Sequence, residues 1–254
     1  MPEDIDYSDA PAAHVEDSPG TTTIATLVEF ANTHHPREDR PWTAADTLKN
    51  VVCTVVHPDG KREVVVIGLP GDREVDLGRA AGTGMLGSGE VDLVAATDED
   101  LENHPGLVKG FIGPGNSLDQ AVLGLEGSTK IRYLLDPRVV NGTRWITGAN
   151  EPDKHVFDLV AGRDFVGDEF IEAAEVVAGD PAPDGSGELQ LARGVEVGQI
   201  FKLGTRYAEA LGLSVLDENG KARVVTMGSY GIGVSRVMAC ICLLYTSDAA
   251  DEED

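Results

Sequence analysis

Apolar residues recur along the first two thirds of the chain in short runs that alternate between helix-like and strand-like spacing. In residues 23–31, apolar side chains at positions 24, 27, 28 and 31 follow the pattern of one helix face, and threonines before them are candidate caps. Residues 43–49 predict a second, short helix that leads into a strand over 50–56. A Pro-Asp-Gly turn and a β-branched run over 63–69 follow, so the two runs predict a hairpin.

The alternation continues to about residue 165. Residues 71–81 predict a polar helical connection, Thr97 has the chemistry of a helix start, and residues 111–117 form a glycine-rich turn. Further strand-like segments are residues 91–96, 130–136 and 139–140, and residues 145–150 lead to a polar loop before residues 154–157. Strands interleaved with helices predict an α/β (α+β) domain over residues 20–165.

Two segments lack this periodicity. Residues 1–19 are acidic and rich in Pro and Ala, which predicts a linker, and residues 178–188 are dense in Pro and Gly, which predicts an exposed joint. After the joint, residues 199–213 predict a helix and a strand–turn–strand follows around 217–221. A glycine-rich segment over 228–236 closes the patterned sequence.

Composition narrows the class of protein. Hydrophobic residues make up 41% of the chain, no apolar run approaches the roughly 20 residues of a membrane span, and the N-terminus is unlike a signal peptide. Cys53, Cys240 and Cys242 show neither a disulfide framework nor a metal-ligand spacing, so we expect a cytoplasmic protein and no metal. The net charge of −24 fits a nucleic-acid partner only if basic residues are concentrated locally, or if other parts of the protein make the main contacts.

Two segments in the last third carry a resemblance. Residues 193–211, RGVEVGQIFKLGTRYAEAL, resemble a core segment of bacterial-type prolyl-tRNA synthetases, with Gln199 where that family usually has His. Residues 226–236, TMGSYGIGVSR, resemble that family's version of class II motif 3. Upstream, residues 17–19, 47–49, 113–115, Asp136 and 148–155 resemble the inserted, YbaK-like editing domain of the same enzymes.

The resemblance implies a division into four parts. Residues 1–19 are a linker, and residues 20–165 are a mixed-sheet editing domain with surrounding helices. Residues 166–240 are part of the antiparallel-sheet class II catalytic core, and residues 241–254 form an acidic tail that resembles a translated sequencing adapter, which we expect to be foreign. Motifs 1 and 2 and the anticodon-binding domain have no counterpart in the chain, so we do not expect the chain alone to aminoacylate.

The implied activity is that of a proline–tRNA ligase with two reactions. The full enzyme, a homodimer, would attach proline to tRNA(Pro) with ATP and Mg²⁺, and the inserted domain would hydrolyse mischarged alanyl-tRNA(Pro) without a cofactor. Editing has a physical reason, because a pocket built for proline cannot strongly reject a smaller amino acid when each missing methylene is worth only ~1–3 kcal/mol.

Six residues receive editing roles from the resemblance. Lys49 matches the lysine that anchors the 3′-terminal nucleotide of tRNA, and the alternative is a solvated lysine at a helix end. His155 matches a histidine that fits the aminoacyl side chain, although a lone His in a polar loop is more often structural. Residues with weaker matches, for which a turn start or a helix cap is the alternative, are Asp136 and Ser18.

The glycine-rich loop completes the implied editing site. Gly113 and Gly115 would shape it over the ester, with backbone N–H groups available to a developing oxyanion. No Ser-His-Asp or Cys-His set accompanies them, and Cys53 in its β-rich stretch is expected to be buried. We therefore expect attack by water, oriented by the substrate's own hydroxyl and the backbone.

The catalytic-core segment carries the implied ligase residues. A planar, permanently charged guanidinium suits both stacking on adenine and pairing with phosphate, and glycines let the backbone approach a ligand closely. A carboxylate or amide meets the imino group of proline, and an aromatic wall suits its ring, although Phe201 has a core aromatic as its alternative. The residues assigned to substrate are Glu196, Gln199, Phe201 and Ser229, and those assigned to ATP are Gly231, Gly233 and Arg236.

Two other functions fit parts of the sequence. A free-standing trans-editing aminoacyl-tRNA deacylase fits residues 20–165 but has no use for residues 189–236. An acidic interaction module is supported only by the net charge and predicts no dependence on Lys49. Residues 180–240 would leave apolar edges exposed in this chain, because the other strands of their sheet are absent.

Overall fold

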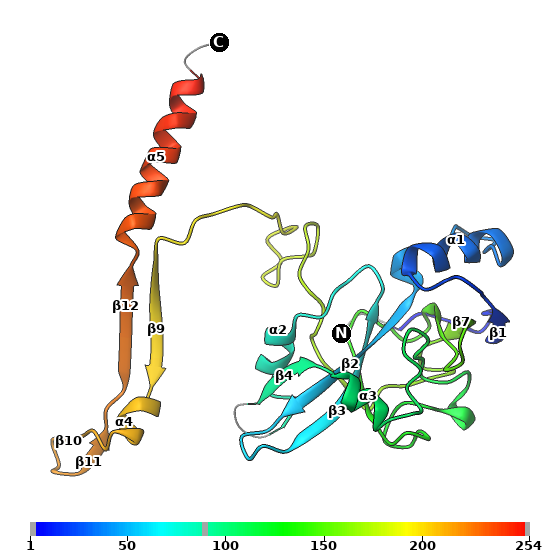
Figure 1. The fold of residues 1–254 in the computed structure, drawn as a ribbon, viewed down its shortest axis with the longest axis horizontal. Coiled ribbons are helices and arrows are strands. Elements are labelled where there is room, and N and C mark those ends of the chain that lie inside the picture. The colour runs from blue at the N-terminus through cyan, green and yellow to red at the C-terminus, as the bar shows by residue number, and fades with distance from the viewer. Residues whose placement is uncertain (1–3, 88–90, 252–254) are drawn as a thin grey trace. The chain divides into compact units, whose positions relative to one another are not determined.

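The hairpin predicted over residues 50–69 forms the centre of the first of two units, Met1–Val176 and Val177–Asp254. The structure is a computed structural model that describes residues 4–87 and 91–251 (Figure 1). Strands β2 (Leu48–Val56) and β3 (Arg62–Pro70) pair antiparallel, because runs of β-branched residues lie on both sides of a tight turn. The hairpin prediction is confirmed.

This hairpin is extended into a five-stranded mixed sheet of order β4-β2-β3-β5-β8. β4 pairs antiparallel with β2, whereas β5 runs parallel to β3 and β8 runs parallel to β5. The mixed sheet confirms the predicted fold class, and β8 extends the first unit beyond residue 165. The added strands are β4 (Asp92–Ala95), β5 (Arg132–Leu135) and β8 (Glu169–Phe170).

A second, antiparallel sheet of three strands has the order β1-β7-β6. It brings the start of the described chain beside residues far along the sequence, since β1 pairs with β7 so that Glu16 lies opposite His155. The strands are β1 (His14–Asp17), β6 (Arg144–Gly148) and β7 (Lys154–Val160). Helix α1 (Ile24–His34), which the sequence predicts, packs on this sheet (Figure 1). Its N-cap Thr23 forms a capping box with Thr26.

The other helices of the first unit are short. They are the 3₁₀ turns η1 (Ala44–Asp46) and η2 (Leu118–Gln120), and the helices α2 (Leu77–Gly82) and α3 (Asp98–Glu102). The helix predicted over 43–49 is wrong beyond its first turn. The Asp46 carboxylate accepts hydrogen bonds from Thr43 and Arg40, which closes one turn, and from Leu48 onward the backbone pairs with β3 instead.

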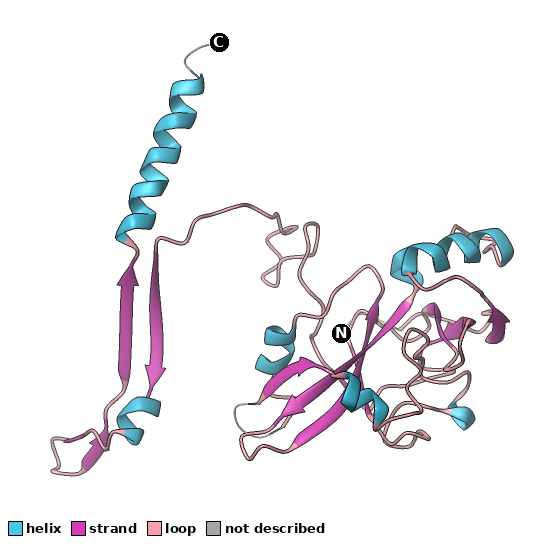
Figure 2. Cartoon of the chain, viewed as in Figure 1, coloured by secondary structure: helices cyan, strands magenta, loops and turns pink. Residues whose placement is uncertain are grey.

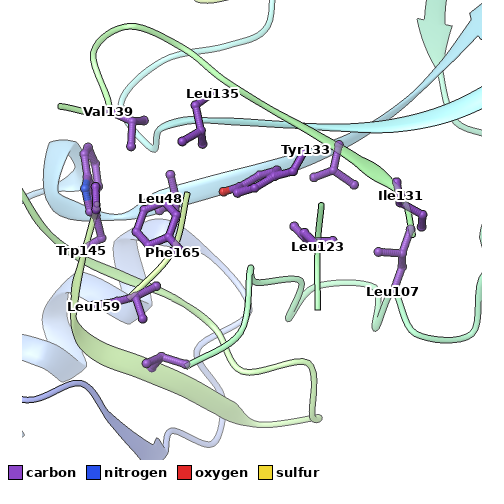
Figure 3. Packing of buried hydrophobic residues seen from close by; sticks show 13 residues of the cluster. Leu48, Leu107, Leu123, Ile131, Tyr133, Leu135, Val139, Trp145, Leu159 and Phe165 are labelled. Atoms are coloured by element: carbon purple, nitrogen blue, oxygen red, sulfur yellow. The ribbon is translucent and has the colours of Figure 1, made fainter. Parts of the chain in front are cut away.

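Side chains bury both faces of the mixed sheet. Val65, Ile67 and Leu134 point into one hydrophobic cluster, whereas their neighbours Val66 and Tyr133 point into the other, as strand alternation requires. Figure 3 shows the second cluster, in which Tyr133 lies among aliphatic side chains and the rings of Trp145 and Phe165. The strand predicted at residues 139–140 is wrong: Val139 is a core residue, but its N–H closes a turn onto Asp136.

The second unit consists of hairpins and helices (Figure 2). Its strands are β9 (Gly198–Gly204), β10 (Ser214–Leu216), β11 (Ala222–Val224) and β12 (Met227–Ile232), and its helices are α4 (Arg206–Ala210) and α5 (Val234–Asp251). The strand–turn–strand prediction is confirmed by the antiparallel pair β10–β11.

The helix predicted over 199–213 is wrong in its first half. Residues 198–204 pair antiparallel with β12, and Gly204, with a φ of +58°, ends the strand before the five-residue α4 begins. Apolar side chains on this hairpin are exposed, as expected for a partial sheet: Ile200 is 86% exposed and Tyr230 is 83% exposed. None of the helices within residues 4–87 and 91–251 has the length and apolar character that crossing a membrane requires.

Candidate functional site

A small cavity lies where the two sheets of the first unit meet. Its volume is about 160 Å³, and its walls come from the loop before α1, the start of β2, the loop over residues 110–112 and the facing ends of β6 and β7. The polar side chains on its walls include Thr21, Lys49, Asn50, Thr147 and His155, together with Thr22, Thr23 and Thr47. Two of the six residues predicted for editing, Lys49 and His155, therefore share one cavity.

His155 is held in the cavity wall as a neutral ring. It is only 4% exposed, and its Nδ1 lies 2.7 Å from Ser18 Oγ and 3.4 Å from Thr21 Oγ1. Burial lowers the pKa of His155 to about 4, with the charge of Asp153 opposing the shift. Among the residues that the structure describes, none hydrogen-bonds Nε2, so this nitrogen is the one that can meet a ligand.

Ser18 contacts His155 and is not the cap of the following helix. It is fully buried, whereas the N-cap of α1 is Thr23. The Thr21 hydroxyl donates to the Ser18 carbonyl at 2.6 Å, which fixes the turn that carries both hydroxyls to the imidazole. Thr21 was not predicted, because a run of threonines before a helix indicates only capping.

Lys49 projects from a strand and not from a helix end. Its Nζ lies 2.6 Å from a carboxylate oxygen of Glu74 and donates to the Arg73 carbonyl at 3.3 Å. The Glu74 side chain is 73% exposed, and such exposed ion pairs contribute only about 0–1 kcal/mol. A phosphate can therefore replace Glu74 at the ammonium group at little cost.

Asn50 forms the centre of a half-buried hydrogen-bond network that was not predicted. Its Oδ1 accepts from the Tyr133 hydroxyl at 2.7 Å, and its Nδ2 donates to Thr147 Oγ1 at 2.9 Å and to the Ile112 carbonyl at 3.0 Å. Thr147 in turn donates to the Leu48 carbonyl at 2.9 Å. Full burial raises the pKa of Tyr133 well above its ordinary value, so the phenol remains a donor.

The glycine-rich loop is fastened to the end of β6 by Asn150. The Asn150 amide accepts from the Gly113 N–H at 3.0 Å and donates to the Gly113 carbonyl at 2.9 Å. A Cβ on Gly113 would lie 1.8 Å from the Gly148 carbonyl oxygen, so only glycine allows this approach. The prediction that the Gly113 N–H is available to an oxyanion is wrong, because Asn150 already occupies it.

The remaining predicted editing residues support the fold around the cavity. Gly115 has a φ of +115°, and a Cβ there would lie 2.4 Å from the Gln120 carbonyl oxygen, so it shapes the neighbouring turn. The fully buried Asp136 carboxylate accepts from the N–H groups of Arg138, Ala173 and Ala174. Asp136 thus starts a turn and anchors a following segment, and it does not line the cavity.

Cys53 does not line the small cavity. It is fully buried in β2, and burial raises the pKa of its thiol to about 11. The expectation that Cys53 is buried is confirmed, and at neutral pH its thiol stays protonated and non-nucleophilic.

A larger cavity of about 660 Å³ gathers a quarter of the basic residues of this acidic chain. Five of the 20 basic residues line it, together with four aspartates and the segment over residues 5–10. The guanidinium of Arg37 stacks 4.7 Å from the centroid of the Trp42 ring, and Arg40 shares the buried Asp46 carboxylate with it. The five are Arg37, Arg40, Arg73, Arg138 and Arg144.

The residues predicted for ligation gather on the β9–β12 hairpin. Gln199 lies opposite Gly231, Phe201 lies opposite Ser229, and the Arg236 guanidinium donates to the Glu196 carbonyl at 2.8 Å. All of them are exposed, as is Gly233. The hairpin therefore presents these residues together on an exposed surface.

Comparison with known proteins assigns the first unit. The family model described as "Aminoacyl-tRNA editing domain" matches residues 18–165, a span that begins at Ser18 and contains every residue of the small cavity. The chain belongs to the aminoacyl-tRNA editing domain family. The match lies entirely within the first unit, so the second unit does not contribute to this assignment.

Curated relatives match nearly the whole chain. The proline–tRNA ligase of Paenarthrobacter aurescens is 61% identical over 247 residues, which is 95% of this chain and 41% of the relative. Those of Kineococcus radiotolerans and Kocuria rhizophila are 60% and 58% identical over 94% and 96% of the chain, covering 39% and 41% of their own lengths. The chain spans about two fifths of the length of the curated relatives it matches.

The Asn50 network predicts a cost for removing its phenol. Tyr133→Phe leaves the Asn50 Oδ1 without its donor, so we expect the free energy of unfolding to fall by about 1–3 kcal/mol in urea denaturation. Tyr230→Phe, which changes an exposed ring, is the matched control and should change stability by less than about 0.5 kcal/mol. Equal effects of the two substitutions would contradict the network.

The buried neutral His155 predicts a loss of stability in acid. Its folded pKa of about 4 lies below the ordinary histidine value of 6.5, so between these values the unfolded state binds the extra proton. This contribution to stability is intact above pH 6.5 and falls by on the order of 3 kcal/mol down to pH 4. Unfolding of wild type and His155→Gln across this range should show a steeper decline for wild type, and parallel curves would refute the assignment.

Proposed function

We propose that the first unit hydrolyses the ester of alanyl-tRNA(Pro) within a proline–tRNA ligase. The observation that carries the proposal is the convergence of Lys49 and His155 on one small cavity inside an aminoacyl-tRNA editing domain. The names of the relatives, matched over nearly the whole chain, support the tRNA for proline, and alanine is a smaller amino acid that a proline pocket cannot strongly reject.

The size of the cavity fits selection of a small aminoacyl group. About 160 Å³ is shared between the terminal ribose and the amino-acid side chain, and Ile112 and Ile146 occupy part of the wall. The hydrogen-bond network around Asn50 prevents the floor from yielding, because close-packed interiors relax only partially. The pocket therefore accepts alanine and excludes the ring of proline by size.

The charged Lys49 and the neutral His155 bind different parts of the substrate. The phosphate of the terminal nucleotide replaces the Glu74 carboxylate as the partner of the Lys49 ammonium group, which binds it as a point charge. The uncharged His155 ring presents Nε2 to the aminoacyl group without repelling its ammonium, because its pKa of about 4 keeps it neutral. Both contacts place the ester carbonyl within the cavity.

The chemical step uses water and leaves the protein unmodified. A water oxygen attacks the ester carbonyl carbon, the bond from carbon to the ribose oxygen breaks, and that oxygen takes up a proton to give tRNA and free alanine. The neighbouring ribose hydroxyl orients the water. No residue on the walls is a thiol, which agrees with a route that forms no covalent enzyme intermediate.

The arginine-lined cavity supports a tRNA partner despite the net charge of −24. Lys49 donates to the carbonyl of Arg73, and Arg73 lines the larger cavity, so the two cavities adjoin through this contact. We place the phosphates of the tRNA acceptor end along these guanidinium groups, which suit phosphate geometry.

For the whole enzyme we propose ATP-dependent ligation of proline to tRNA(Pro), with Mg²⁺, in a cytoplasmic homodimer. The relatives' names support the ligase activity, and the exposed hairpin bearing Gln199, Phe201 and Arg236 supports a site completed by other strands. A free-standing deacylase loses support because the relatives match nearly the whole chain, including residues beyond the editing domain. An acidic interaction module loses support because it does not need an editing cavity.

Lys49→Ala tests the editing proposal. With the chain incubated with alanyl-tRNA(Pro) below saturation, we expect deacylation at least about tenfold slower than wild type, because the phosphate loses its cationic partner. The matched control is Lys154→Ala, which removes an exposed lysine next to His155 and should leave the rate unchanged. Deacylation no faster than in buffer, or equal rates for wild type and Lys49→Ala, would sink the proposal.

Arg40→Gln tests the placement of the tRNA backbone. We expect weaker tRNA(Pro) binding and a plot of log affinity against log salt that is shallower by about one unit, as for the loss of one phosphate contact. Lys109→Gln, at an exposed lysine outside both cavities, is the control and should keep the wild-type slope. Identical slopes for all three proteins would contradict the placement.

A further inference from the structure

Three metal-ligand side chains converge outside both cavities. Their ligand atoms, from His14, Glu16 and His35, all lie within 4.8 Å of one another. The two carboxylate oxygens of Glu16 each face one imidazole: Oε1 lies 3.5 Å from His14 Nε2, and Oε2 lies 4.0 Å from His35 Nε2. None of the three was singled out from the sequence, because a strand and a helix end bring them together.

The fold positions these groups with little freedom. His14 and Glu16 are two residues apart on β1 and so share one face of the strand, and α1 returns His35 as its C-cap. Both imidazoles lie against the buried ring of Phe157, with centroid separations of 5.9 Å for His14 and 4.6 Å for His35. A shared aromatic floor restricts the rotation of both ligands.

The surroundings of His14 resemble the outer shell of a metal site. Its Nδ1 lies 3.4 Å from the Ala12 carbonyl oxygen and 3.9 Å from Asp158 Oδ2, while Nε2 faces Glu16. Asp158 is itself held by Arg144 Nε at 3.1 Å. Metal-bound histidines usually donate their second ring N–H to a carboxylate or carbonyl in this way, which orients the ring and raises its basicity.

The electrostatic setting favours a cation. The site lies at the C-terminal end of α1, where the helix dipole is negative, and it contains the Glu16 carboxylate with Asp158 behind it. Two nitrogen ligands select a transition metal over Mg²⁺ or Ca²⁺, which prefer oxygen. The ligand side chains are 25–40% exposed, so an ion has a route of entry.

We propose that His14 Nε2, His35 Nε2 and the Glu16 carboxylate bind one divalent transition metal of the Zn²⁺ type, with water in the fourth position. Tetrahedral zinc with bonds of about 2.0–2.1 Å places its ligand atoms about 3.3 Å apart. The ligand atoms now lie within 4.8 Å of one another, so binding an ion requires the three side chains to close by up to about 1.5 Å. This inference stands independently of the proposed editing function.

The ion would fasten β1 to the end of α1. β1 leads directly into Ser18, which contacts His155, and the start of α1 forms part of the editing cavity wall. A metal at the far end of the helix thus fixes the connection that carries one wall of the cavity. Its role is structural, because the ligands do not line that cavity.

The test is a titration of the full chain with metal. Cys240→Ser and Cys242→Ser form the background, so that thiolates do not compete, and excess Mg²⁺ suppresses binding to the many surface carboxylates. After treatment with a chelator, we expect one equivalent of Zn²⁺ to bind in calorimetry and to raise the melting temperature. Co²⁺ should give the visible absorption of a tetrahedral site.

Variants assign the ligands. His14→Gln and His35→Gln should each weaken Zn²⁺ binding by about tenfold or more and abolish the Co²⁺ spectrum. His34→Ala, an exposed histidine beside His35, is the matched control and should bind as the background does. Metal-free melting temperatures equal to the background show that the variants fold. Absence of saturable binding, or equal binding by background and both Gln variants, would overturn the proposal.

Discussion

The candidate site depends on the hydrogen bonds of the Asn50 side chain. Its amide hydrogen-bonds with Tyr133 of β5, Thr147 of β6 and the carbonyl of Ile112, so one residue of β2 joins both sheets and the loop over the cavity. Each bond contributes only about 1 kcal/mol of net stability, but leaving any partner buried and unpaired costs more. The network therefore specifies one arrangement of the cavity walls.

Lys49 and His155 acquire their properties from this arrangement. Lys49 is adjacent to Asn50 in β2, and Thr147 belongs to the strand that pairs with the strand of His155. Burial is the dominant influence on His155, which stays neutral, and the carboxylate that pairs with Lys49 belongs to the exposed Glu74. One of the two side chains is kept uncharged and the other charged, which is the combination that the proposed binding of an aminoacyl ester beside a phosphate requires.

The elements that sequence predicts well are those with local causes. The β2–β3 hairpin follows from β-branched runs around a tight turn, and α1 follows from its apolar face and its threonine cap. Residues 198–204 have apolar positions compatible with either structure, and only pairing with β12 makes them a strand. The short turn at Asp46 depends on a guanidinium six residues away, which periodicity does not reveal.

The site divides in the same way. The resemblance directs attention to Lys49 and His155, and the structure places both on one cavity. The sequence does not predict a role for Asn50 or Thr21, because both contact residues that are far away along the chain. Asp136 and Gly113 are the opposite case. The resemblance assigns both to the site, but their hydrogen bonds hold the surrounding fold together.

Selectivity between two esters tests the account most directly. The chain would be incubated in parallel with alanyl-tRNA(Pro) and prolyl-tRNA(Pro), and release of each amino acid would be followed over time. A rigid cavity of about 160 Å³ predicts hydrolysis of the alanyl ester and a prolyl ester as stable as in buffer. Hydrolysis of both esters at the same rate would contradict selection by this cavity.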